Sequence, residues 1–291
     1  MPSLKQINTK ISSVKGTRRI MSAMKLIAAV KLQRSQSMLK EFRPYSDAYK
    51  EIVTGVAGKC DPRVHPLLRK PKEIKKMHFV FFTSDRGLCG SFNTGLIRNF
   101  GNHINEAPFN KDQVSISFVG RRGKDHCSSA GFSIGDYFSG ANEKNYIEIA
   151  NKLTVSAIEQ FQKGNIDEVV LVYNYFKSVL NQEITFEKLL PIEVKEEEIS
   201  GSDYIYEPKR ESIIGDVVPK YVQVRIERAI QESLTSEHAS RMTAMENATT
   251  NADDVIKKLT LLFNKTRQAM ITTELMDIVN GTEAQKQGGN D

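Results

Sequence analysis

The sequence has little of the chemistry on which metal centres and disulfide frameworks depend. It contains no tryptophan and only three cysteines, Cys60, Cys89 and Cys127, among 291 residues, and no two of them have C-x-x-C spacing. Its five histidines form neither an H-E-x-x-H motif nor a cluster with cysteine. We therefore expect no metal site, no structural disulfide and a reducing compartment.

Long apolar runs are also missing. No stretch approaches the ~18–20 consecutive apolar residues of a membrane-spanning helix. The first residues, MPSLKQINTK, have neither the apolar core of a signal peptide nor the composition of a transit segment. We expect a protein that starts at this methionine and stays inside the cell.

Positive charge is concentrated at one end of the chain. Residues 1–43 contain ten Lys and Arg residues and one acidic residue, Glu41, whereas residues 44–210 are balanced and residues 211–291 have an excess of three acidic residues. The basic end fits a solvated helix face, a nucleic-acid contact or a contact with an acidic protein surface. It lacks interleaved aromatic residues, which argues against nucleic acid.

The basic end also has the pattern of a long helix. Ser3 and Gln6 fit a capping box at its start. A 4,3 spacing typical of a coiled-coil seam follows, in which Arg18, Lys25 and Ser35 take three places. The apolar places are Ile7, Ile11, Val14, Met21, Ala28, Leu32, Leu39 and Phe42. Because charges on a buried side need partners, Arg18 and Lys25 favour an acidic protein partner for this helix.

The other end predicts a longer helix. The 61 residues between Pro219 and Gly281 include no Gly or Pro, which corresponds to ~90 Å of helix. Pro219 fits either the first helical turn or a kink in a helix that begins near Glu211, and Gly281 fits a C-terminal cap. We expect this helix to pair antiparallel with the first one.

Two stripes run along this second helix. The expected pairing seam comprises Ile226, Ile230, Leu234, Glu237, Arg241, Ala244, Ala248, Asn251 and Val255. A second stripe on another face comprises Met242, Met245, Ala252, Ile256, Phe263 and Met270. A helix that is apolar on more than one side needs partners on more than one side.

The middle of the chain alternates between strand and helix patterns. Strands are predicted over residues 75–85, 113–120 and 167–176, with an edge strand over 181–192, and helices over 92–104, 123–130 and 146–162. This order predicts an α/β fold with a mostly parallel, Rossmann-like sheet, inserted between two paired helices. The predicted divisions are an N-terminal coiled-coil helix (1–58), a connecting loop (59–74), a central α/β domain (75–194), a linker (195–210), a C-terminal coiled-coil helix (211–281) and a flexible tail (282–291).

One stretch, TSDRGLCGSF at residues 83–92, resembles the rim of an active site. It follows the first predicted strand, where open α/β sheets bind ligands, but it lacks the spacing of a dinucleotide or phosphate loop. The later string GRRGKD has Asp125 where a phosphate loop needs Ser or Thr. We interpret Cys89 as a buried residue in a tight strand-to-helix corner, with Asp85 as its cap and Gly87 and Gly90 permitting the turn. A small-molecule enzyme using the Asp85–Cys89 loop, or a coiled-coil scaffold, is the alternative.

Several long motifs, in the same order from end to end, resemble the gamma subunits of F-type ATP synthases of the bacterial type. They are INTKISSVKGTRRIMSAMKLIAAVKL near the start, SDRGLCGSFN in the centre, DYIYEP at 203–208 and SEHASRMTAMENATTNADDVIKKLTLLFNKTRQAMITTELMDIVNG at 236–281. The resemblance implies a non-catalytic rotor stalk without cofactors that couples ion flow to ATP synthesis or hydrolysis. The implied partners are three alpha and three beta subunits, the epsilon subunit and the membrane c-ring, but no nucleic acid. The implied location is peripheral, at the cytoplasmic face of the bacterial inner membrane.

The resemblance also implies site residues. Met24, Lys25 and Arg241 match positions at the lever of the beta subunit, and Arg267 and Gln268 match a pair that bonds a beta-subunit loop. Tyr204 and Glu207 match residues that touch the c-ring.

Helix lengths add an apolar tip to these sites. Helices over 3–57 and 211–281 leave the second one 16 residues longer, an overhang of ~24 Å. Its exposed apolar residues would be Met270, Ile271, Leu275, Met276, Ile278 and Val279, which by resemblance turn inside the alpha/beta ring.

Overall fold

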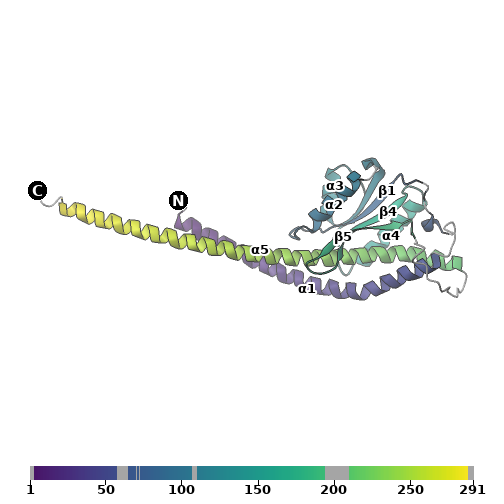
Figure 1. The fold of residues 1–291 in the computed structure, drawn as a ribbon, viewed down its shortest axis with the longest axis horizontal. Helices are drawn as coiled ribbons and strands as arrows, with labels where there is room; N and C mark the ends of the chain where they lie inside the picture. The colour runs from purple at the N-terminus through teal and green to yellow at the C-terminus, as the bar shows by residue number, and fades with distance from the viewer. Residues whose placement is uncertain are drawn as a thin grey trace. The chain divides into compact units, whose positions relative to one another are not determined.

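The computed structural model describes residues 3–57, 65–69, 71, 73–106, 110–193 and 210–287. The chain divides into two units: residues 28–243 form the larger one, and residues 1–27 with 244–291 form the smaller one. Helices α1 (Leu4–Ala57) and α5 (Arg210–Gln287) contribute to both (Figure 1).

The larger unit is built on a five-stranded sheet with the order β3-β2-β1-β4-β5. Strands β1 (Met77–Phe82), β2 (Val114–Val119), β3 (Ser133–Phe138) and β4 (Glu168–Phe176) are parallel, and β5 (Gln182–Leu190) pairs antiparallel with β4 at one edge. The predicted mostly parallel sheet and its edge strand are confirmed.

Strand β3 was missed by the sequence pattern. Its six residues, SIGDYF, are exposed or half-buried throughout, because it lies at the other edge of the sheet. A central strand is recognised by its continuous apolar run, and an edge strand interrupted by Gly135 and Asp136 has none.

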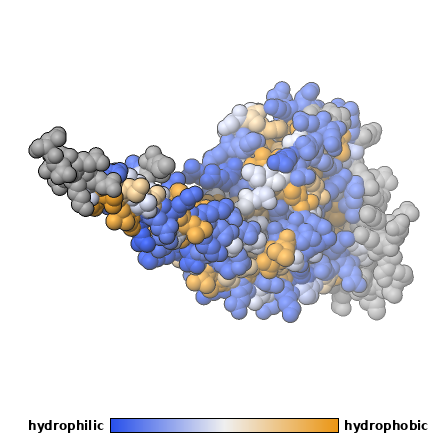
Figure 2. Space-filling view, turned by 60° about the vertical axis from the view of Figure 1, so that its left-hand side comes forward, coloured by the Kyte–Doolittle hydropathy of each residue, from blue (hydrophilic) through white to orange (hydrophobic). Residues whose placement is uncertain are grey.

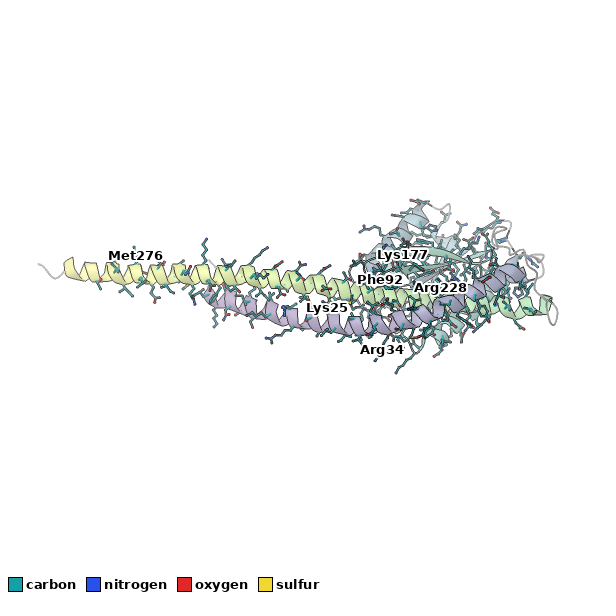
Figure 3. The ribbon with its side chains drawn as sticks, turned by 60° about the horizontal axis from the view of Figure 1, so that its bottom comes forward. Lys25, Arg34, Phe92, Lys177, Arg228 and Met276 are labelled. Atoms are coloured by element: carbon teal, nitrogen blue, oxygen red, sulfur yellow. The ribbon has the colours of Figure 1, made fainter. Side chains whose placement is uncertain are left out.

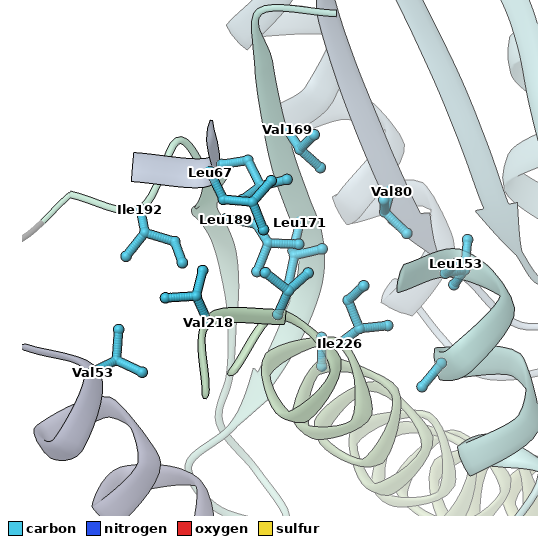
Figure 4. Close-up of a cluster of buried hydrophobic side chains, with 14 of the residues drawn as sticks. Val53, Leu67, Val80, Leu153, Val169, Leu171, Leu189, Ile192, Val218 and Ile226 are labelled. Carbon is cyan, nitrogen blue, oxygen red and sulfur yellow. The ribbon is translucent and has the colours of Figure 1, made fainter. Parts of the chain in front are cut away.

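Helices cover both faces of the sheet. On one face, α2 (Phe92–Glu106) and α3 (Arg121–Ser129) pack Leu96, Phe100 and Cys127 against Phe79 and Phe81 of β1. On the other face, α4 (Tyr146–Gln162), α1 and α5 surround the side chains shown in Figure 4. Short 3-10 turns occupy Pro66–Leu68 and Lys111–Gln113.

Within the larger unit, α5 is a core helix with partners on several sides. Ile226 and Ile230 pack with the sheet and α4, and Ala239 packs with Leu32 and Leu39 of α1. Each fully buried aliphatic side chain contributes roughly 1.5–3 kcal/mol relative to exposure. The predicted need for partners on more than one side is therefore confirmed here.

The smaller unit is an antiparallel pair of helix segments. The capping box at its start is present, since Ser3 N–H donates to Gln6 Oε1 (3.0 Å) and Gln6 N–H donates to Ser3 Oγ (3.3 Å). Arg18 pairs with Asp253 at 2.6 Å and Lys25 with Glu246 at 2.7 Å. Residue numbers in both pairs add up to 271, which fixes an antiparallel register.

The expected pairing seam of α5 is wrong at its end in this unit, although Ala244 and Ala248 are half-buried. Asn251 and Val255 are exposed, whereas Met245 and Ala252, from the second stripe, are only 4% and 8% exposed. A straight α-helix drifts by about 20° per heptad relative to a strict 4,3 count. The expected 4,3 spacing starts at Ile226, which packs on the sheet. Extended from there, the spacing does not follow the face of α5 that meets α1.

The second helix also runs beyond its predicted end. It continues past Gly281 to Gln287, so Gly281 is not a C-terminal cap. A single exposed glycine destabilises a helix by only about 1 kcal/mol, and the good helix formers Glu283 and Ala284 follow it. At the other end the helix starts at Arg210, which places Pro219 inside it.

Candidate functional site

The loop between β1 and α2 buries its cysteine. Cys89 is 2% exposed, and its Sγ lies 3.2 Å from Asn93 Nδ2 and 3.6 Å from Ser84 Oγ. Burial raises the pKa of the Cys89 thiol above its ordinary value, which disfavours the nucleophilic thiolate. Its recorded hydrogen-bond partners include no base, so the geometry supports the interpretation of Cys89 as a packing residue.

Asp85 is a cap, but for a distant helix. Its carboxylate accepts the backbone N–H of Arg121 (3.0 Å), at the start of α3, and that of Gly140 (2.7 Å) after β3. Asp85 was expected to cap its own turn, and instead it joins three segments at the carboxyl edge of the sheet. A carboxylate at a helix N-terminus also complements the helix dipole.

The tight corner uses different residues from those expected. Leu88 (φ 63°) and Gly90 (φ 57°) take the left-handed conformation, so Leu88 and not Gly87 accompanies Gly90. The conformation costs a non-glycine residue roughly 1–2 kcal/mol.

The glycines of GRRGKD have a packing role. A Cβ on Gly120 would lie 2.0 Å from Thr83 O, and one on Gly123 would lie 2.8 Å from Phe81 Cδ1. These positions let α3 start directly against the end of β1. This accounts for both glycines without a phosphate ligand.

Arg241 holds the same loop from α5. Its Nη2 donates to the carbonyl oxygens of Arg86 (3.2 Å) and Gly87 (3.3 Å), and its Nη1 bonds Glu237 Oε1 at 2.6 Å. The Arg241 side chain is only 13% exposed. The family resemblance assigns Arg241 to a partner contact, and no sequence pattern indicates this second role inside the larger unit.

The two charged seam residues of α1 have partners within the chain. Arg18 and Lys25 pair with Asp253 and Glu246 of α5, and Met24 beside them is half-buried. The argument that these two charges require an acidic partner protein is therefore wrong. The exposed lysines and arginines elsewhere on α1 are the ones that can meet such a surface.

The last part of α5 has no helix beside it in the smaller unit. In the register set by the two ion pairs, Leu4 lies opposite residue 267, so residues 268–287 extend past the start of α1, by about 30 Å. Arg267 and Gln268 are exposed at this point. Figure 3 shows Met276 on the unaccompanied stretch.

The overhang is apolar. The side chains of Met270, Ile271, Leu275, Met276, Ile278 and Val279 are 49–59% exposed. Figure 2 shows orange surface on this part of the helix. Several apolar side chains gathered on one exposed helix indicate an interaction surface.

Some residues singled out in the sequence cannot be placed. Tyr204, Glu207 and Cys60 lie outside the described residues. Across the described ranges, no group of His, Cys, Asp and Glu is arranged to hold a metal ion. None of the helices in those ranges has the length and hydropathy to span a membrane.

Comparison with known proteins identifies the family. A family model described as ATP synthase matches residues 3–285. The chain is 42% identical over 289 residues to the ATP synthase gamma chain of Trichlorobacter lovleyi, covering 98% of this chain and 100% of the relative. It is 41% identical over 290 residues to that of Nitratidesulfovibrio vulgaris strain Hildenborough, with the same coverage.

Solved structures share the fold. A chain in the cryo-EM structure of the Euglena gracilis mitochondrial ATP synthase in rotational state 3 has a TM-score of 0.68 at 18% identity, covering 99% of this chain and 96% of its own length. A chain of the Euglena rotor in state 1 has a TM-score of 0.67 at 17% identity, covering 92% and 98%. With the family match and the full-length relatives, the conclusion is that this chain belongs to the ATP synthase gamma-chain family.

Proposed function

We propose that this chain is the central-stalk rotor subunit of an F-type ATP synthase, coupling ion flow through the membrane sector to ATP synthesis or hydrolysis. One observation carries the proposal: α5 extends past α1 and exposes six apolar side chains on a single helix. A helix of this kind fits a shaft end that turns inside an apolar sleeve. Relatives named ATP synthase gamma chain, matched over their full length, support this choice of complex.

The partners that fit this role are three alpha and three beta subunits around the helices, with the epsilon subunit and the c-ring at the other end. The location that follows is the cytoplasmic face of the bacterial inner membrane, reached through the complex. Support comes from fold-sharing chains whose structures are described as a rotor and as an OSCP/F1/c-ring assembly.

The proposed contact residues differ in exposure and in whether they already have partners within the chain. Arg267 and Gln268 are exposed, so they can bond a beta-subunit loop directly. Lys25 and Arg241 must exchange an internal partner for a beta-subunit carboxylate. The c-ring contacts of Tyr204 and Glu207, like the Met24 contact, rest on the resemblance.

The physical basis of coupling is asymmetry. A single chain has no threefold symmetry, so it presents different side chains to three identical beta subunits. Each contact stabilises one conformation of its subunit more than the others, which makes the occupancy of the catalytic states depend on rotor angle. The chain needs no catalytic group for this. The enzyme alternative is not favoured, because Cys89 is buried and Asp85 is used as a helix cap.

The test is a pair of variants in the purified complex. Truncation after Asn264 removes the apolar tip, and we expect assembly with alpha and beta subunits, or ATP-driven rotation, to weaken several-fold. Cys89→Ser is the matched control, with nearly unchanged ATPase activity expected, because the thiol only packs. Loss of activity in Cys89→Ser together with an unaffected truncation would favour the small-molecule enzyme instead.

A further inference from the structure

In the larger unit, three elements meet at one ion pair whose carboxylate is buried. Glu232 of α5 has a fully buried side chain, and both of its carboxylate oxygens accept hydrogen bonds from Arg43 of α1, from Nε at 2.9 Å and from Nη2 at 2.8 Å. The same carboxylate accepts the backbone N–H of Phe176 in β4 at 3.0 Å, and Arg43 Nη2 donates to the Phe176 carbonyl oxygen at 2.5 Å. One carboxylate and one guanidinium thus join both long helices to the sheet.

Neighbouring groups hold this junction in place. The Arg43 guanidinium carbon lies 4.8 Å from the centre of the Tyr175 ring. Arg228, labelled in Figure 3, lies one turn before Glu232 on α5. It bonds Asp47 of α1, and its Nε is 3.6 Å from Glu232 Oε1. About one turn before Arg228, Arg225 bonds Glu187 of β5 at 2.5 Å.

The energetics indicate a role other than stability. Replacing a buried ion pair with apolar residues of similar volume is often neutral or stabilising, because desolvation of the charges offsets their attraction. What the pair adds is direction: a bidentate guanidinium–carboxylate bond fixes the relative position of its two elements. Apolar packing of about the right volume, by contrast, tolerates substitution and loses uniqueness and rigidity before it loses stability.

From these contacts, and relying on the rotor function proposed above, we propose that Arg43 and Glu232 are positioning residues that lock α1, α5 and β4 against slipping when the chain transmits torque. Both helices continue from this unit into the paired-helix unit. Torque applied to the α/β unit must pass to the helices through such junctions. Without the directional bonds, the helices can slip relative to the sheet while the chain stays folded.

The decisive variant replaces the pair with apolar residues, Arg43→Met with Glu232→Leu, in the complete membrane-bound complex. Three quantities are measured: the melting temperature, the rate of ATP hydrolysis, and the ATP-driven membrane potential in sealed vesicles reported by a voltage-sensitive dye. We expect hydrolysis within twofold of wild type and a modestly lower melting temperature, because the buried Phe176 N–H loses its acceptor while the charges no longer need desolvation. The potential generated at a matched hydrolysis rate should fall at least threefold. A potential equal to that of wild type would overturn the proposal.

Two further variants keep the test decisive. The control, Arg18→Met with Asp253→Leu, removes a half-exposed pair between the same two helices and should leave the potential unchanged. An equal loss in this control would also overturn the proposal, because the effect would then not belong to the buried junction.

If the apolar pair fails to assemble, Glu232→Gln, which keeps the shape of the carboxylate, decides in its place: a lowered potential supports the lock and an unchanged one contradicts it. Failure of the wild-type chain to assemble with alpha and beta subunits would contradict the rotor function itself.

Discussion

At the scale of single residues, the loop after β1 contains side chains typical of an active site that have structural roles instead. Asp85 caps α3, and Arg241 binds the backbone carbonyls of Arg86 and Gly87. Cys89 is packed beneath the same corner. Reactive-looking side chains here hold a loop, a strand end and two helices together.

His238 makes the stability of the larger unit depend on pH. Burial lowers the pKa of His238 to about 4, with smaller contributions in the same direction from the charges of Lys31 and Arg241, while Glu143, 3.9 Å from Nε2, opposes the shift. The unfolded chain, with a histidine pKa near 6.5, therefore binds more protons between pH 6.5 and 4, and stability falls as the pH decreases through that window. We expect protonation linked to His238 to lower the free energy of unfolding by about 2 kcal/mol between pH 7 and pH 5.

The measurement is urea unfolding at both pH values for the wild-type chain and for His238→Gln. Over this pH range, the free energy of unfolding of the variant should fall by about 2 kcal/mol less than that of wild type. Identical losses in the two proteins would show that His238 is not the group responsible.

At the scale of elements, α5 changes its role along its length. Between Ile214 and Ala239 it is a core helix with buried polar residues such as Glu232 and Thr235. In the smaller unit it packs one stripe, which includes Met245 and Ala252, against α1. Residues 268–282 are exposed. One continuous helix thus lies in three environments: the core of the larger unit, the contact with α1 in the smaller unit, and solvent.

The corrected seam predicts which substitutions disturb the paired helices. Ala252→Asp places an unpaired charge on the buried stripe and should reduce the free energy of unfolding of the helix pair by about 2 kcal/mol or more. Val255→Asp is the matched control on the exposed face of the same helix, and its effect should stay within about 0.5 kcal/mol. Helix content followed by circular dichroism during thermal unfolding compares the two variants. A larger effect for Val255→Asp would restore the original seam.

At the scale of the whole molecule, the chain exposes apolar surface that its own fold does not cover. The tip of α5 is at least half-exposed at five of its six large apolar residues. Exposed apolar patches often mark interaction sites, which supports the proposed role of this tip. Because the chain belongs to the gamma-chain family, the proposed partners of that surface are the alpha and beta subunits.

Making the tip polar should therefore affect assembly and not folding. We expect Met270→Ser combined with Met276→Ser to leave the melting temperature of the free chain unchanged, because both side chains are exposed. Dissociation from the alpha/beta ring should become about tenfold faster, which surface-bound alpha and beta subunits can report. Leu180→Ser, at a residue that is 85% exposed on the β4–β5 turn, is the control and should dissociate as wild type does. Equal rates for all three proteins would contradict a bearing role for the tip.

The sequence by itself determined the features that depend on local periodicity and end signals. These include the two long helices, the Ser3–Gln6 capping box, the strands β1, β2 and β4 and the exposed apolar tip, since each is written in the spacing of neighbouring residues. Family membership was also recognisable from the long motifs. The chain's division into domains and its contacts with partner proteins stay predictions.

Only the tertiary structure decided which faces meet. It assigned the second stripe of α5 to α1, gave Arg18 and Lys25 partners within the chain, and brought Asp85, Arg121 and Gly140 together. It also placed Arg43, Phe176 and Glu232 at one junction, although they lie far apart in the sequence. The physical reason is that periodicity specifies that a face is buried, whereas the partner of that face depends on packing between distant segments.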